Sequence, residues 1–116
     1  MPHNAHTTAS DALWTGLPVL TRLGGAFAGR VAASLLTAVG LPELIVATQE
    51  EYEATAIDLA ANLDRLRALQ EKLARNRLTT PLFDSRLYAA RLGAAFEAMH
   101  ARRLANLPPD DIYAPA

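Results

Sequence analysis

Two short apolar segments on either side of a helical pattern most constrain how this chain can fold. Residues 18–21 (PVLT) and 44–46 (LIV) have the composition of short buried strands. Between them, apolar side chains recur from Phe27 at intervals of four, four and three residues, which is the pattern of one helix face. Strands joined by a crossover helix pair in parallel, so we predict an α/β domain.

Residues typical of helix ends predict several helices before and after these strands. A Thr8–Asp11 pair has the spacing of a capping box, so a first helix is predicted to begin there and to end at Gly16. The pair Thr48 and Glu51 is predicted to open a third helix in the same way, after the one that begins at Phe27.

Two further helices are predicted after residue 62, with Asp64 and Asp84 as their caps and a break at Pro81 between them. Apolar residues at helical spacing on the last helix are expected to face inward, either in the core or against another lobe. They are Tyr88, Leu92, Ala95, Phe96 and Met99. Two short strands do not make a self-sufficient sheet, so either helices cover their edges or further strands lie outside this sequence.

The composition excludes several classes of protein. Hydrophobic residues make up 51% of the chain and charged residues 20%, which is typical of a globular domain. The net charge of −1 without a basic stripe argues against nucleic acid or a membrane surface as a partner. The absence of cysteine excludes disulfides, thiol nucleophiles and cysteine zinc sites. With no signal peptide and no membrane-length apolar stretch visible, we expect a soluble, cytoplasmic protein.

The motif with the most chemistry is HTTASD at residues 6–11. Thr7 and Thr8 offer hydroxyls and backbone N–H groups at a helix N-terminus, which favours an anion, and His6 adds a donor that can approach a phosphate. Asp11 lies about one turn along, where a carboxylate could accept the hydroxyls of a ribose. On spacing alone, a simple helix cap is the commoner role of a Thr-x-x-Asp pair.

A longer resemblance bears on that choice. The chain resembles the protein O-linked N-acetylglucosamine transferases of the SPINDLY type, glycosyltransferase family 41. The similar stretches are HTTASDALWTGLPVLT at residues 6–21, FAGRVAAS at 27–34, GLPEL at 40–44, EY at 51–52 and RLTTPLFD at 77–84. The last helix and the Pro-rich tail also look like the C-terminus of that family, so the likeness spans nearly the whole chain.

The resemblance implies a helix-rich α/β fold with about two short parallel strands and about five helices. This would be part of the Rossmann-like C-terminal lobe of a two-lobed, GT-B type glycosyltransferase. Residues 1–104 would form the partial lobe and residues 105–116 an extended Pro-rich tail. The family's tetratricopeptide repeats, its N-terminal lobe and the first half of its C-terminal lobe are expected to lie outside this sequence. The segment 24–26 (GGA) departs from the family's more usual Pro-Gly arrangement.

The resemblance also implies a donor site. In the family the His-Thr-Thr element contacts the diphosphate of the uridine diphosphate (UDP) sugar, and the following Asp contacts the ribose. These roles fall on His6, Thr7, Thr8 and Asp11. The family transfers N-acetylglucosamine from UDP-GlcNAc to Ser or Thr of proteins without a metal, so we expect no cofactor. No catalytic residue is assigned to this sequence, and the chain alone is expected to have little or no transferase activity.

The expected partners are UDP-GlcNAc, a protein acceptor, and either the N-terminal lobe or a self-associating copy. An alternative role is that of an inactive helical packing or self-association module, in which the motif is only a helix cap. Other candidate residues are weaker. His3 and His6 lack the further ligands of a metal site. Arg30 could reach a phosphate, but an ion pair or a solvated position is the commoner role of such a residue. Trp14 and Phe27 are expected in the core rather than as a stacking platform.

Overall fold

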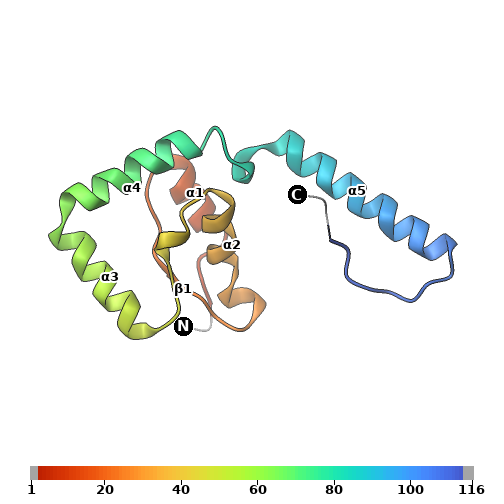
Figure 1. Cartoon of the computed structure of the whole chain (residues 1–116), viewed down its shortest axis with the longest axis horizontal. Coiled ribbons are helices and arrows are strands. Elements are labelled where there is room, and N and C mark those ends of the chain that lie inside the picture. Colours follow the sequence, from red (N-terminus) through yellow and green to blue (C-terminus); the bar gives the residue numbers. More distant parts are fainter. Residues whose placement is uncertain (1–2, 114–116) are drawn as a thin grey trace. The chain divides into compact units, whose positions relative to one another are not determined.

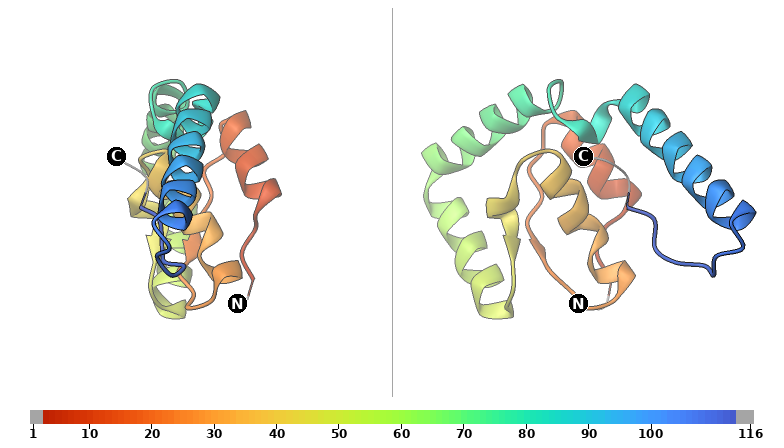
Figure 2. Two further views of the ribbon diagram at one scale, coloured as in Figure 1. Left: turned by 90° about the vertical axis from the view of Figure 1, so that its right-hand side faces the viewer. Right: turned by 45° about the vertical axis from the view of Figure 1, so that its right-hand side comes forward.

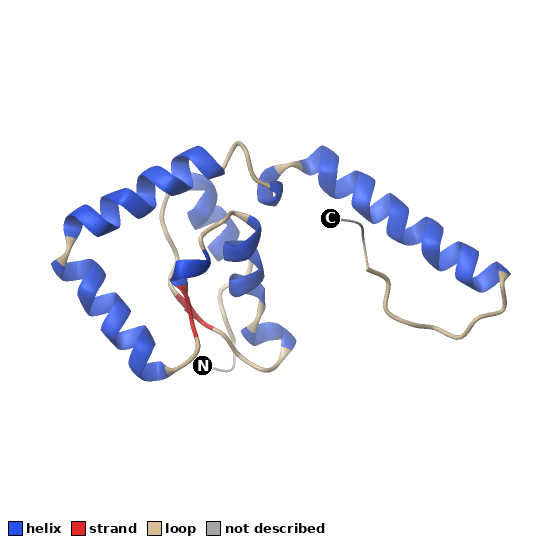
Figure 3. Cartoon of the chain, viewed as in Figure 1, coloured by secondary structure: helices blue, strands red, loops and turns tan. Residues whose placement is uncertain are grey.

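The computed structural model describes residues 3–113, and helices dominate it (Figure 3). The α-helices are α1 (Thr7–Thr15), α2 (Val31–Ala38), α3 (Gln49–Ala61), α4 (Leu63–Asn76) and α5 (Ser85–Leu104). The 3-10 helices are η1 (Phe27–Gly29), η2 (Pro42–Leu44) and η3 (Pro81–Phe83). Two short strands, β1 (Thr21–Arg22) and β2 (Ile45–Val46), pair in parallel, with Thr21 opposite Ile45. The predicted helix-rich α/β architecture is therefore confirmed.

The chain divides into two compact units, Met1–Phe83 and Asp84–Ala116. The first unit contains α1 to α4 and both strands. Figures 1 and 2 show the strand pair between α2 on one side and α3 on the other, with α4 continuing from α3. Both α2 and α3 contact β1, so helices of the same unit flank the strand pair. Further strands beyond this sequence stay a prediction.

The core of the first unit is built almost entirely from leucine. Its members are buried to at least about nine-tenths and come from α1, α2, α3, α4 and the segment between α2 and β2. They are Leu13, Leu36, Val39, Leu41, Leu44, Leu59, Leu69 and Leu73. Burying a leucine side chain contributes roughly 1.5–3 kcal/mol, so this cluster is the main source of stability in the unit.

Glycines with positive φ end the first two helices. Gly16, at φ +91°, follows α1, and the next backbone N–H, that of Leu17, donates to Ala12 at 2.9 Å. Gly40, at φ +75°, follows α2 and lets the chain turn toward η2. Left-handed backbone is cheap for glycine and costly for other residues. The helix ends predicted from these two glycines are confirmed.

Two of the four predicted N-terminal caps are formed as expected. The Thr48 hydroxyl accepts from the Glu51 N–H at 3.1 Å, while the Glu51 carboxylate accepts from the Thr48 N–H at 3.3 Å. This is a complete capping box at the start of α3. The Asp84 carboxylate accepts from the Leu87 N–H at 2.8 Å and caps α5.

The other two predicted caps are wrong. Helix α1 begins earlier than expected, so Thr8 lies inside it, and no side chain caps its first turn. Helix α4 is capped by Asn62, whose side chain accepts from the Arg65 N–H at 3.1 Å, and Asp64 lies in the first turn instead. In both cases a residue type common at caps occurs one or two positions beyond the true boundary.

Two boundaries also differ from the sequence prediction. Of the predicted strand at residues 18–21, only Thr21 pairs, and the strand continues to Arg22. The helix predicted from Phe27 begins as the 3-10 turn η1, and α2 starts only at Val31. Phe27 is therefore not on the buried face of α2, and its side chain is 74% exposed. Apolar periodicity did not reveal the change of helix type.

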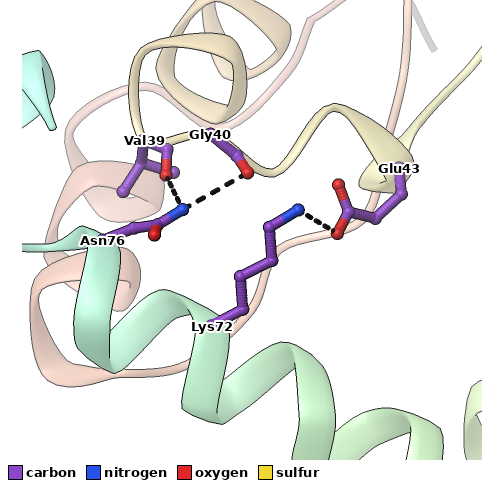
Figure 4. A network of polar contacts seen from close by, with 5 residues as sticks. All are labelled: Val39, Gly40, Glu43, Lys72 and Asn76. Carbon is purple, nitrogen blue, oxygen red and sulfur yellow. Dashed lines mark hydrogen bonds and ion pairs between the residues drawn. The ribbon is translucent and has the colours of Figure 1, made fainter.

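Polar contacts join α4 to the segment that follows α2 (Figure 4). Asn76 Nδ2 donates to the carbonyls of Val39 at 2.9 Å and Gly40 at 3.4 Å. One turn earlier, Lys72 Nζ donates to Glu43 Oε1 at 2.6 Å. Asn76 thus satisfies carbonyl groups that the end of α2 leaves without helical partners. These contacts fix α4 over the leucine core.

The second unit consists of α5 and the segment after it. The apolar face predicted for α5 is not part of a core within the described residues, because Tyr88, Leu92, Phe96 and Met99 are 41–67% exposed and only Ala95 of the predicted set is partly buried. Its packing against another lobe stays a prediction. A single helix offers no second apolar layer against which such a face could be buried.

The segment after α5 turns back along the helix within this unit. Arg102 holds it there, since its Nε donates to the Pro108 carbonyl at 2.8 Å and its Nη2 to Asp110 at 3.2 Å. Residues 107–113 have no regular secondary structure, and the last three residues of the predicted tail lie outside the described residues. Within residues 3–113, no helix combines the length and the apolar character needed to cross a membrane.

The Glu43–Lys72 pair predicts a pH-dependent contribution to stability. Partial burial raises the pKa of Glu43, but the hydrogen bond and charge of Lys72 outweigh it, so the pKa is lowered overall. A lowered pKa stabilises the folded state above the pKa of the unfolded chain, and this gain is lost as pH falls through the folded value. Glu43→Gln should therefore lower the free energy of unfolding by less than about 1 kcal/mol at neutral pH, because the pair is partly exposed.

Urea denaturation of the unsubstituted chain and of Glu43→Gln at several pH values measures the difference in their free energies of unfolding. We expect this difference to shrink as the pH falls below the ordinary pKa of a glutamate. A difference that stays constant between neutral pH and pH 3 would contradict the assignment.

Candidate functional site

The N-terminus of α1 presents backbone donors to solvent. The His6 carbonyl accepts from the N–H groups of Ala9 and Ser10, both at 3.1 Å. Thr7 and Thr8, which precede them, are the first two residues of the helix, where an N–H has no acceptor within the helix. Both threonines are exposed and no side chain caps the first turn. This geometry, with the helix dipole behind it, favours an anion.

His6 lies beside these donors and is held by the loop before α2. Its Nε2 lies 3.3 Å from the Ala28 carbonyl oxygen. Because a carbonyl only accepts, Nε2 is the donor and Nδ1 is the ring nitrogen left for other partners. The Phe27 ring meets the His6 ring edge to face, with centroids 6.1 Å apart. These contacts orient the imidazole at the N-terminus of α1.

Asp11 completes the predicted set. It is exposed and follows Thr8 by three residues and Thr7 by four, so the three side chains share one face of α1. The structure thus brings His6, Thr7, Thr8 and Asp11 together at one helix end, with the carboxylate about one turn from the free N–H groups. Their role in binding a nucleotide stays a prediction.

The other candidate residues lie outside this group. Trp14 lies at the other end of α1 and is 50% exposed, so its predicted core position is wrong, as it is for Phe27. Its ring packs edge-on to Phe83 at 5.1 Å and beneath the Arg77 guanidinium at 5.3 Å. Arg30 is exposed at the N-cap of α2. Among the described residues, no group of three or more His, Asp or Glu side chains could hold a metal ion.

A loop at residues 24–29 supports the site, and the sequence alone did not indicate this role. The Gly24 N–H donates to the Gly29 carbonyl at 2.7 Å and closes the loop. A Cβ on Gly24 would lie 2.9 Å from the Gly29 Cα, and one on Gly29 would lie 3.0 Å from the Gly24 Cα. Both positions therefore require glycine for close backbone approach. The sequence shows the glycines, but not that the two residues meet.

Comparison with known proteins identifies the chain's relatives. The model of Glycosyl transferase family 41 matches residues 2–92. The chain belongs to this family. It is 43% identical over 97 residues to the probable UDP-N-acetylglucosamine–peptide N-acetylglucosaminyltransferase SEC of Arabidopsis thaliana. The matched residues are 83% of the chain and 10% of that relative. The Caenorhabditis elegans UDP-N-acetylglucosamine–peptide N-acetylglucosaminyltransferase is 37% identical over 109 residues, 94% of the chain and 10% of the relative.

The family 41 likeness extends to a solved structure. A mutant of the Thermobaculum terrenum O-GlcNAc transferase superimposes with a TM-score of 0.79 at 39% identity, covering 85% of this chain and 19% of that one. The probable SPINDLY transferase of Hordeum vulgare is 34% identical over 101 residues, 87% of the chain and 11% of that relative. These matches confirm the predicted family and GT-B fold class. The chain spans about a tenth of the length of the curated relatives it matches.

The close approach of Gly24 and Gly29 can be tested by substitution. Gly29→Ala should lower the free energy of unfolding by about 1–3 kcal/mol, because its Cβ meets backbone that cannot rotate away. Gly25→Ala is the matched control, since a Cβ there meets nothing within 4 Å. It should change stability by less than about 1 kcal/mol. Equal losses in urea denaturation would show that the close approach is not required.

Proposed function

We propose that this chain supplies the diphosphate and ribose part of the donor site in a UDP-GlcNAc-dependent peptide N-acetylglucosaminyltransferase. The observation that carries the proposal is the uncapped, exposed N-terminus of α1 in a member of family 41. A side-chain cap would occupy one of the N–H groups of the first turn, and none of the described side chains does so here. The residues proposed to bind UDP are His6, Thr7, Thr8 and Asp11.

Each residue has a distinct chemical task in this proposal. The N–H and hydroxyl groups of Thr7 and Thr8 bind diphosphate oxygens. With Nε2 on the Ala28 carbonyl, His6 donates to a diphosphate oxygen from Nδ1 in its doubly protonated form only. Asp11 is kept away from the phosphates by charge repulsion and accepts from the ribose hydroxyls. When the sugar leaves, negative charge grows on the diphosphate, and these fixed donors stabilise it in place of a metal ion.

The transfer of N-acetylglucosamine to Ser or Thr of an acceptor protein belongs to the larger enzyme. The Arabidopsis and Caenorhabditis relatives are named for this peptide transfer, and the chain covers a tenth of each. Chemistry of this kind requires donor and acceptor to be held together, which we assign to a further lobe. The 116-residue chain alone should therefore bind donor weakly and transfer little. The metal-free chemistry and the cytoplasmic location stay predictions.

A 31P NMR titration of UDP with the 116-residue chain tests the proposal. We expect saturable binding with a dissociation constant near the millimolar range. Thr8→Ala and Asp11→Ala should each weaken it by about tenfold or more, because each removes a hydrogen bond with a charged partner. Thr15→Ala at the other end of α1 is the control, since its hydroxyl bonds only within the helix. It should leave the affinity unchanged.

The absence of saturable binding would overturn the proposal, as would equal weakening by all three substitutions. In that case the self-association alternative gains support. Sedimentation velocity over a range of concentrations would then test it, because the exposed apolar side chains of α5 are the surface that a second copy would cover.

A further inference from the structure

Asn4 makes three hydrogen bonds to residues that follow it by 18 to 25 positions. Its backbone N–H donates to the Ala28 carbonyl at 2.8 Å. Its side-chain Nδ2 donates to the carbonyls of Gly29 at 2.7 Å and Arg22 at 3.4 Å. Asn4 is partly buried and lies two residues before the N-cap of α1. It therefore ties the approach to α1 to a distant part of the chain.

The amide side chain suits this position because it carries two donors on one nitrogen. One donor reaches Arg22, the last residue of β1, and the other reaches Gly29, the last residue of η1. The Gly29 carbonyl also accepts from the Gly24 N–H at 2.7 Å. Asn4 thus joins both ends of the glycine loop, and a carboxylate or a methyl group at this position could not.

The same loop also orients His6. The Ala28 carbonyl accepts from the Asn4 N–H and from His6 Nε2, so one peptide group fixes both residues. Displacing residue 4 from the loop would release this shared acceptor. The imidazole and the first turn of α1 would then be free to shift relative to each other, although neither would lose its own side chain.

We propose that Asn4 is a positioning residue for the diphosphate end of the donor site. It binds no ligand itself. It holds residues 4–6 against residues 22–29, so that the His6 ring and the N–H groups of Thr7 and Thr8 converge on one point. This inference rests on the proposed function, since it assigns Asn4 its role at the same site.

Asn4→Ala is the test variant and Asn62→Ala is its matched control. The Asn62 side chain also makes a hydrogen bond to the backbone, in this case accepting from the Arg65 N–H three residues along. It caps α4, which is far along the chain from the site. Both substitutions should lower the free energy of unfolding in urea. Only Asn4→Ala should weaken the binding of UDP and of inorganic pyrophosphate in the 31P titration, by about fivefold to tenfold.

A ligand-free readout separates this inference from the proposed function. The ring 1H–13C resonances of His6 should move in Asn4→Ala and stay unchanged in Asn62→Ala. If the unsubstituted chain binds neither UDP nor pyrophosphate, the proposed function fails, and the His6 resonances still test whether Asn4 orients the ring.

Two results would overturn the inference. One is an Asn4→Ala chain with unchanged His6 resonances and unchanged affinity. The other is equal weakening by Asn4→Ala and Asn62→Ala, which would show a general effect of stability. If Asn4→Ala does not fold, Asn4→Asp keeps the size of the side chain while removing its donors, and the same losses are expected. Failure of both variants to fold would show that Asn4 serves the fold and not the site.

Discussion

The burial of one face of α1 against the leucine core is the interaction on which the site depends. Leu13 is fully buried with Leu36 of α2 in the same cluster, and Ala9 is 2% exposed one turn earlier. These two residues fix the rotation of α1 about its own axis. With that rotation set, Thr7, Thr8 and Asp11 point to solvent because no other face of the helix is free. Apolar packing thereby determines which way the polar groups face.

Much of the fold could be predicted from signals that are local in sequence. The capping box at Thr48 and the glycine after α1 each act within one turn of a helix, so their residues are sufficient to reveal them. The parallel pairing followed from chain connectivity alone, because a helix between two strands leaves little choice. The four proposed ligands lie within six residues of each other, and for this reason their proximity at one helix end was also predictable.

The rest depended on contacts between distant residues. Nothing local distinguishes the Thr8–Asp11 pair from a true cap, and only the structure shows that the N-cap of α1 is His6, two residues before Thr8. The bonds from Asn4 to Gly29 and from Asn76 to Val39 span 25 and 37 residues. The exposed face of α5 was predicted as buried because periodicity shows that a face is apolar, and not what covers it.

In the proposed site, the N–H groups in the first turn of α1 bind the diphosphate of a nucleotide. A 1H–15N spectrum of the 116-residue chain, recorded while UDP is added, tests it most directly because each backbone amide reports separately. We expect saturable shifts for the amides of Thr7 and Thr8, with those of Leu69 and Leu73 in α4 unmoved. Saturable shifts confined to other residues, with Thr7 and Thr8 unchanged, would contradict it.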